Sequence, residues 1–541
     1  MGFSIRPATV ADTFKWLDLV RATLGDNYPA KELYDVHLIG TLLDPANGEE
    51  TWVAESAGCL QGSVTFLKPW GPNRNPVANL GRNLIRPESV ADGSAEALLR
   101  VVNEIATQRG EMAIVRLSAM DNAQQILFEN MDYVCVGFQP LKHLLQQRLG
   151  ILFYVHGANA VLVTRNPLSE SLPQVSELGL AALENLQIHT DFLVRDGLCG
   201  YPLQSDLKIH DATPDDFELW LIQSESAHPP LEISGRFNFG LGLMRLPIQR
   251  RARAFLAQRN DKMTAGMTCY FDEQDRCARI TEAFCCDDVS MGALLMHVLK
   301  VMQQEANAVY TEVDILATAP RLLKSAEQLG FVPVAYLPAF FCRNGRYSDV
   351  VKMVKLNVPY SLEKTEFTAH AKSIVEIIDR NFEDQKMGLA IINLLRPLSM
   401  FTDLGDGELR KVARLFVQKL YRAGEQVFPK GETGDEAYVI LRGKISIHLE
   451  QGAPSIAQLG DGKIFGEVAF LDGAPRAAFA VASQPSILLV MKRAAFSDLV
   501  RREPTLGMIV MRNLAQDLAI KLRTVNDALS GARKPTGKTR S

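Results

Sequence analysis

The chain lacks the features of secreted and membrane-spanning proteins. Its N-terminus, residues 1–6, has no basic segment followed by an apolar one, so no secretion signal is predicted. Its most apolar stretch, residues 151–163, is broken by His156 and Gly157 and falls short of the roughly 18 apolar residues that a spanning helix needs. We therefore expect a cytoplasmic protein with no membrane partner.

The sequence also lacks closely spaced CxxC cysteines and a strong net charge. The eight cysteines include no CxxC pair, which predicts reduced core residues and no metal site. The only adjacent pair, Cys285 and Cys286, is the candidate for oxidation. A net charge of −4 gives no electrostatic signature for nucleic acid or an anionic membrane. With 541 residues, of which 47% are hydrophobic and 22% charged, the chain is expected to form about three or four ordinary globular domains.

The most informative stretch lies at residues 465–478, which read Phe-Gly-Glu-Val-Ala-Phe-Leu-Asp-Gly-Ala-Pro-Arg-Ala-Ala. Arg476 offers a planar, permanently charged fork for a phosphate. Small residues at Ala469, Ala477 and Ala478 let backbone N–H groups approach that anion. Glu467 accepts hydrogen bonds only, which suits a sugar hydroxyl. A cyclic phosphodiester with one negative charge and a free 2′-hydroxyl fits this pattern.

This stretch closely resembles the phosphate-binding cassette of cyclic-nucleotide-binding domains, and residues 431–443 resemble the earlier β-roll hairpin of that family. The resemblance implies a nucleotide site at Gly466, Glu467, Val468, Ala469, Arg476 and Ala477, with Gly466 and Glu467 on the ribose and Arg476 and Ala477 on the cyclic phosphate. Ala477 is typical of members that prefer cAMP. Phe479 departs from the family pattern, so cGMP remains an alternative ligand.

The first 356 residues contain an internal duplication. The opening Ile5 to Asp12 recurs at Ile209 to Asp216, and Trp16 recurs as Trp220. Predicted helices at 94–108 and 290–306, each followed by a strand, a helix and a further strand, continue the repeat.

Both repeats resemble the GNAT acetyltransferase superfamily, in which a mixed sheet opens to admit acyl-CoA. Residues 86–99 align with its pyrophosphate loop, so the resemblance implies acetyl-CoA binding at Gly93, Ser94 and Ala95. Val90 and Ala91 replace the usual polar residue and first glycine, and Phe128 stands where a tyrosine often acts as the acid. The second repeat places Asp287 and Asp288 in the loop, where their negative charges are unfavourable for a diphosphate. It also has Ala326 at the tyrosine position.

Helical segments flank the nucleotide-binding module. Ile374, Ile377, Ile378 and Phe382 form an apolar stripe before it. After it, a helix at 504–526 resembles the family's lid, and Leu514, Leu518 and Leu522 give it an apolar face that could cap the nucleotide or pair with another protomer. The remaining chain is too short for a winged helix-turn-helix, so no DNA-binding domain is expected.

The predicted fold class is therefore α+β multidomain: two GNAT-like mixed α/β sheets, a helical linker, and a cyclic-nucleotide-binding β-roll with C-terminal lid helices. The predicted segments are a first GNAT-like domain (1–166), a connector (167–204), a second GNAT-like domain (205–357), a helical linker (358–397), the nucleotide-binding domain (398–530) and a disordered tail (531–541).

Two functional hypotheses follow. In the first, a cyclic nucleotide, favoured as cAMP, regulates an acetyl-CoA-dependent N-acetyltransferase that acts on an amine, such as a protein lysine. In the second, the degenerate repeats are a non-catalytic scaffold that binds a signalling partner. The catalytic residues are unknown, because Glu55, Glu88 and His143 are candidate bases and nothing in the sequence selects among them.

Overall fold

The computed structural model describes residues 2–26, 28, 31–67, 77–120, 122–144, 147–157, 161–162, 164–166, 170–190, 198–203, 206–212, 232–233, 250–260, 262–343, 345–362, 365–404, 406–502 and 504–532. The second copy of the repeated opening beyond Ala212, including Trp220, and the tail from residue 533 lie outside the described residues. The chain forms two compact units, Met1–Phe382 and Glu383–Ser541. The finer division into six segments stays a prediction.

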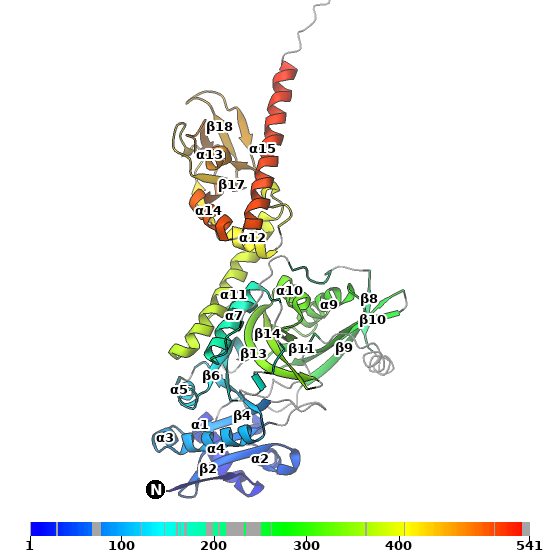
Figure 1. Cartoon of the computed structure of the whole chain (residues 1–541), viewed down its shortest axis with the longest axis vertical. Coiled ribbons are helices and arrows are strands. Elements are labelled where there is room, and N and C mark those ends of the chain that lie inside the picture. Colours follow the sequence, from blue (N-terminus) through cyan, green and yellow to red (C-terminus); the bar gives the residue numbers. More distant parts are fainter. Residues whose placement is uncertain are drawn as a thin grey trace, which may run out of the picture. The chain divides into compact units, whose positions relative to one another are not determined.

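The first unit is built on one sheet that combines 14 strands of the described chain. Its strand order is the same in each half, read from the outer edge inward. The first half runs β1 (Phe3–Pro7), β2 (Glu50–Ser56), β3 (Cys59–Phe66), β4 (Val77–Ile85), β5 (Met112–Ser118), β7 (Arg148–His156) and β6 (Val134–Leu144). The second runs β8 (Lys208–Asp211), β9 (Arg250–Arg259), β10 (Lys262–Asp272), β11 (Cys277–Cys285), β12 (Tyr310–Leu316), β14 (Arg346–Leu356) and β13 (Val332–Arg343). In Figure 1 the labelled strands β2, β4 and β6 of the first half are blue to cyan, and β9, β11, β13 and β14 of the second half are green. The matching strand order supports the predicted duplication.

The helices occupy matching positions in the two halves. Helix α4 (Ser94–Gln108) packs on β2 and β3, and α9 (Ser290–Gln304) packs on β9 and β10. The predicted helix at 94–108 is confirmed, and the predicted helix at 290–306 ends two residues early. The other α-helices in the described residues of this part are α1 (Thr13–Leu24), α2 (Val36–Leu43), α3 (Pro87–Ala91), α5 (Asn122–Glu129), α7 (Pro173–Asn185) and α10 (Pro320–Gln328). Helix α11 (Ala369–Leu395) begins in the first unit and ends in the second.

Among the described strands, each half has one parallel pair, and its two strands separate along their length. Strands β4 and β5 pair only over 77–80 and 112–115, although β4 continues to Ile85 and β5 to Ser118. Strands β11 and β12 likewise pair only over 277–280 and 310–313. The carboxyl ends of two neighbouring parallel strands therefore separate in both halves.

Buried charges lie where the two halves meet. Lys142 of β6 reaches Glu312 of β12 with a distance of 2.9 Å between Nζ and Oε2. In the second half, Asp314 pairs with both Arg279 and Lys352, and all three side chains are fully buried. Such pairs cost desolvation and stabilise only when well matched, so the Lys142–Glu312 pair, which joins the two halves, favours one alignment of the halves over others.

The second unit is a β-roll of two four-stranded sheets in the described chain. One sheet has the order β15 (Phe416–Tyr421), β22 (Ser486–Lys492), β17 (Glu436–Arg442), β20 (Ile464–Phe465). The other has the order β16 (Gln426–Phe428), β21 (Phe479–Ala482), β18 (Ile445–His448), β19 (Ala457–Leu459). Its helices are α12 (Asp406–Ala413), α13 (Glu467–Asp472), α14 (Arg493–Arg502) and α15 (Pro504–Ala532). Among the described residues no helix is long and apolar enough to cross a membrane.

Candidate functional site

The predicted cassette forms a short helix bounded by two glycines. Gly466 precedes α13 at φ +76°, and Gly473 follows it at φ +77°, both in the left-handed region that favours glycine. A side chain at position 466 would meet Arg476 Nη1 at 2.8 Å. The loop that carries Arg476 is held by the backbone N–H of Arg476, which donates to the carbonyl of Glu432 at 2.8 Å.

Arg476 lies inside the roll with 5% of its surface exposed. Its Nη1 donates to the carbonyl of Gly466 and its Nη2 to the carbonyl of Glu436, each at 2.7 Å. Its Nε is buried and has no hydrogen-bond partner among the described residues. The two carbonyls hold the Arg476 guanidinium in place. Because a guanidinium carries five N–H donors, it retains donors for an anion.

Aromatic rings and a glycine complete the setting of this guanidinium. Its carbon lies 4.3 Å from the ring centre of Phe428 and 5.6 Å from that of Tyr438, within the range of cation–π attraction. A side chain at Gly434 would lie 2.6 Å from the Ala469 Cβ and 2.7 Å from the guanidinium. Close approach of these elements therefore requires glycine at 434.

Glu467 is buried and paired with a residue that the sequence analysis missed. Lys521 of α15 donates to Glu467 Oε1 at 2.7 Å and to the carbonyl of Ile464 at 2.9 Å. Burial alone would lower the pKa of Lys521, but the negative charges and hydrogen bonds of Glu467 and Asp517 raise it by more. The pKa of Lys521 therefore lies above its ordinary value. In the sequence, the one sign of this pairing was a lysine close to the apolar positions Leu514 and Leu518.

The other predicted nucleotide-binding residues line the same cassette. The side chain of Ala469 is buried, whereas Val468 is 55% exposed and Ala477 is exposed. The Val468 side chain points to solvent, so its backbone is the part that could face a ligand. The structure thus brings all six predicted positions together, and their contacts with nucleotide stay a prediction.

The residues predicted to hold acetyl-CoA lie at the start of α4. Gly93 has φ +78° and caps the helix, while Ser94 and Ala95 are buried. Asp92 Oδ1 accepts the N–H of Ser94 at 2.8 Å, which places a carboxylate where a diphosphate was expected. In the second half, Asp287 Oδ1 accepts the N–H groups of Val289 and Ser290 at 3.0 and 2.7 Å.

The three candidate bases do not converge. Glu55 accepts from Lys15 at 2.5 Å and from Arg6 at 2.6 Å, and these cations lower its pKa, so it is a poor proton acceptor. Glu88 is exposed in α3. His143 is buried, and its Nδ1 lies 2.8 Å from Asp275 Oδ2, which ties the β6–β7 hairpin to the turn before β11.

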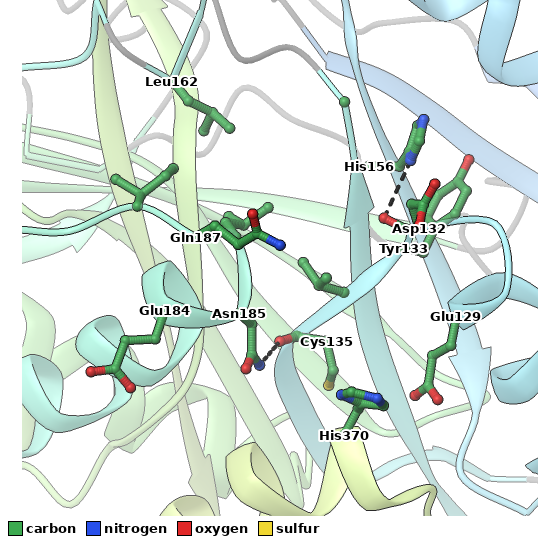
Figure 2. Close-up of a pocket in the computed structure, with 14 residues that line it drawn as sticks. Glu129, Asp132, Tyr133, Cys135, His156, Leu162, Glu184, Asn185, Gln187 and His370 are labelled. Atoms are coloured by element: carbon green, nitrogen blue, oxygen red, sulfur yellow. Dashed lines mark hydrogen bonds between the residues drawn. The ribbon is translucent and has the colours of Figure 1, made fainter.

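A separate cavity of about 870 Å³ lies at the far end of the first half (Figure 2). His156 stacks on Tyr133 with ring centres 4.9 Å apart, and Asn185 Nδ2 donates to the carbonyl of Cys135 at 2.9 Å. Burial raises the pKa of Cys135 to about 12, which excludes a thiolate nucleophile there at neutral pH. Because His156 pairs with Ala113 at the start of β5, this cavity is at the end opposite to the strand separation. No group of three metal-ligating side chains occurs in the described part of the chain.

Comparisons with known proteins find matches in the C-terminal unit. Residues 418–503 match the family described as Cyclic nucleotide-binding domain. The Cyclic AMP receptor protein of Thermus thermophilus is 35% identical over 127 residues, which is 23% of this chain and 57% of that protein. The cAMP-dependent protein kinase type II regulatory subunit of Drosophila melanogaster is 32% identical over 133 residues, 24% of this chain and 34% of that protein. This chain thus spans less than two thirds of either relative.

A solved cyclic nucleotide-binding domain from Methylobacillus flagellatus is 28% identical, with a TM-score of 0.25, and covers 30% of this chain and 88% of that one. The family match at residues 418–503 contains every residue of the cassette described above. The C-terminal unit of this chain therefore carries a cyclic nucleotide-binding domain.

Proposed function

We propose that this protein is a cAMP sensor whose ligand binds at the cassette formed by residues 466–477. Arg476 carries the proposal, since it is fixed by two carbonyls, buried, and left with an Nε that has no partner in the described chain. An oxygen of a cyclic phosphate supplies such a partner. Glu467, at the start of α13, is placed to accept from a ribose hydroxyl.

The choice of cAMP over cGMP rests on Ala477 and on the two relatives whose names refer to cAMP. A cGMP-dependent protein kinase of Caenorhabditis briggsae is 32% identical over 125 residues, so both nucleotides belong in the test.

Calorimetric titration of cAMP and cGMP into the full-length protein tests this function. Arg476→Ala should weaken binding by roughly tenfold to a hundredfold, because a charge-assisted hydrogen-bond donor is lost. Arg476→Lys should recover little, since an ammonium lacks the fork. Arg442→Ala, which removes an exposed arginine of the same unit, is the matched control. If the wild-type protein binds neither nucleotide, the proposal is wrong.

For the first unit we propose two GNAT-like domains joined into one sheet. The repeated strand order and the separation of the parallel pair β4–β5, and of β11–β12, support this assignment. The arrangement is compatible with a nucleotide-regulated N-acetyltransferase that holds acetyl-CoA at Gly93, Ser94 and Ala95.

A non-catalytic scaffold is favoured by a specific observation. Asp92 and Asp287 accept hydrogen bonds from the first N–H groups of α4 and α9, so these donors are not available to a diphosphate. A carboxylate at this place also repels a diphosphate. Titration of acetyl-CoA with and without saturating cAMP separates the two functions. Micromolar affinity that shifts with cAMP, and does not shift in Arg476→Ala, supports the enzyme, whereas no binding under either condition supports the scaffold that binds a protein partner.

We also propose that α15 pairs two protomers. Met508, Met511, Ala515 and Leu518 recur at spacings of three and four residues, the pattern of a coiled-coil seam. Met508 is 65% exposed and Met511 42% exposed. Leu514, which the sequence predicts on an apolar face that could cap the nucleotide or pair with another protomer, is buried in the core of its own unit.

A further inference from the structure

The ion pair between Lys521 and Glu467 joins the last helix to the cassette. These residues are 54 positions apart, and the side chain of Glu467 is 8% exposed while that of Lys521 is 36% exposed. A charged group buried to this degree costs desolvation free energy unless it is paired. Among the described residues, Lys521 is the ion-pair partner that Glu467 has.

The ammonium of Lys521 has no donor left for a ligand. Its three N–H groups are matched by Glu467 Oε1 at 2.7 Å, the carbonyl of Ile464 at 2.9 Å and Asp517 Oδ2 at 3.0 Å. Any effect of Lys521 on a bound nucleotide must therefore pass through the groups it holds.

Glu467 keeps one oxygen for a ligand. Lys521 bonds to Oε1, and no hydrogen bond to Oε2 occurs within the described chain. The ammonium also offsets the negative charge of the carboxylate, which would otherwise repel a phosphodiester bound nearby. Ile464 and Glu467 flank the turn at Gly466, so one ammonium fixes both sides of that turn.

We propose that Lys521 is the positioning residue for ribose recognition, orienting Glu467 so that its Oε2 accepts from the 2′-hydroxyl of the bound nucleotide. This inference rests on the proposed binding of a cyclic nucleotide at the cassette. Since Lys521 and Asp517 both lie on α15, recognition of the sugar and the placement of this helix depend on the same ion pair.

The test compares the affinities of the full-length protein for cAMP and 2′-deoxy-cAMP. The wild-type protein should prefer cAMP by about tenfold or more, the usual effect of a hydrogen bond to a charged acceptor. Lys521→Met should bind cAMP more weakly and reduce that preference to about threefold or less. Lys521→Arg, which keeps the charge, should restore most of the preference.

A matched control removes a different tether of the same helix. Arg512 of α15 pairs with Asp403 at 2.6 Å and makes no contact with Glu467 among its described interactions. Arg512→Met should leave the ratio of the two affinities unchanged even if it lowers the melting temperature. Lys521→Gln, which places a shorter, uncharged polar side chain there, provides a second variant if Lys521→Met does not fold.

The outcomes separate the two proposals. If the wild-type protein binds neither nucleotide, the proposed function fails. If it binds cAMP with the expected preference and the Lys521 variants retain the same ratio, the role of Lys521 is overturned. Equal weakening of both nucleotides in Lys521→Met and Arg512→Met would show that Lys521 only tethers the helix, which also overturns the inference.

Discussion

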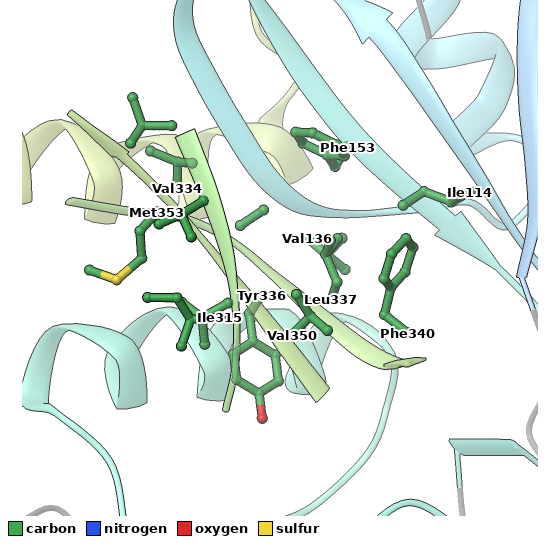
Figure 3. Close-up of a cluster of buried hydrophobic side chains, with 14 of the residues drawn as sticks. Ile114, Val136, Phe153, Ile315, Val334, Tyr336, Leu337, Phe340, Val350 and Met353 are labelled. Carbon is green, nitrogen blue, oxygen red and sulfur yellow. The ribbon is translucent and has the colours of Figure 1, made fainter. Parts of the chain in front are cut away.

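Gly137 of β6 faces Ala335 of β13 at the register pair that, within the described strands, joins the two halves of the 14-stranded sheet. A Cβ built at 137 would lie 2.1 Å from the Ala335 Cβ and 2.8 Å from the carbonyl oxygen of Val334. Figure 3 shows buried side chains of both halves in the same region, including Val136 and Phe153 from the first and Val334 and Val350 from the second. The halves therefore share one core around a contact that only glycine allows.

Gly137→Ala should destabilise the first unit. The added methyl group must push two backbones apart inside a close-packed core, which costs about 1–3 kcal/mol. Urea unfolding followed by circular dichroism measures the loss. Gly40→Ala is the control, because its Cβ would meet only the Thr13 and Val10 side chains, at ordinary contact distances of 3.6 and 3.8 Å. Gly40 lies in α2, where alanine is the better helix former. Equal stabilities of the two variants would contradict the assigned register.

Local elements of this fold could be predicted from the sequence. The helix at 94–108 was predicted with correct ends, because its apolar positions recur at helical spacing. The cassette could be located because its glycines, Glu467 and Arg476 are close in the chain and their chemistry is specific.

Contacts between distant segments could not be predicted. No local pattern shows that Gly137 faces Ala335, since pairing of strands so far apart is set by the packing of whole domains. Lys521 lies on the same helix as Leu514 and Leu518, and only the three-dimensional arrangement shows that it reaches Glu467. The role of Asp92 was also missed, because a carboxylate in a loop has no fixed partner until the helix forms.

Gly434→Ala should weaken cyclic nucleotide binding while leaving the unit folded. The new Cβ would lie 2.7 Å from the Arg476 guanidinium and 2.6 Å from Ala469, so the fork must shift from its place. A displaced charge-assisted donor lowers affinity by about tenfold. Calorimetric titration of cAMP checks this, with Gly460→Ala as the control, since nothing lies within 4 Å of its added Cβ. Unchanged affinity in Gly434→Ala would show that the position of Arg476 does not govern binding.

The ion pair between Arg6 and Asp12 should make the free energy of unfolding of the first unit fall at acidic pH. Arg6 donates to Asp12 at 2.7 and 2.8 Å and lowers the pKa of Asp12 from its ordinary value to about 2. A lowered carboxyl pKa adds stability above about pH 4, and this is lost as the pH falls toward 2. Asp12→Asn should therefore cost about 1–2 kcal/mol at pH 7 and little at pH 2.

Urea unfolding of both proteins between pH 7 and pH 2 measures that difference. Asp18→Asn is the control, because the Asp18 side chain is 66% exposed and its pair with Arg86 lies at the surface. A difference between Asp12→Asn and the wild type that stays constant across this range would contradict the role of the ion pair.

Substitution of the exposed methionines of α15 should dissociate the proposed dimer. In Met508→Glu/Met511→Glu, two like charges on each helix would face their copies across the seam and replace apolar contacts worth about 1.5–3 kcal/mol for each fully buried side chain. Light scattering coupled to size exclusion should then give a dimer mass for the wild-type protein and a monomer mass for the variant at micromolar concentration. Met296→Glu on α9, where the methionine is 38% exposed, controls for the added charge and should remain a dimer. A wild-type protein that is already monomeric, or a double variant that stays dimeric, would exclude pairing through this face of α15.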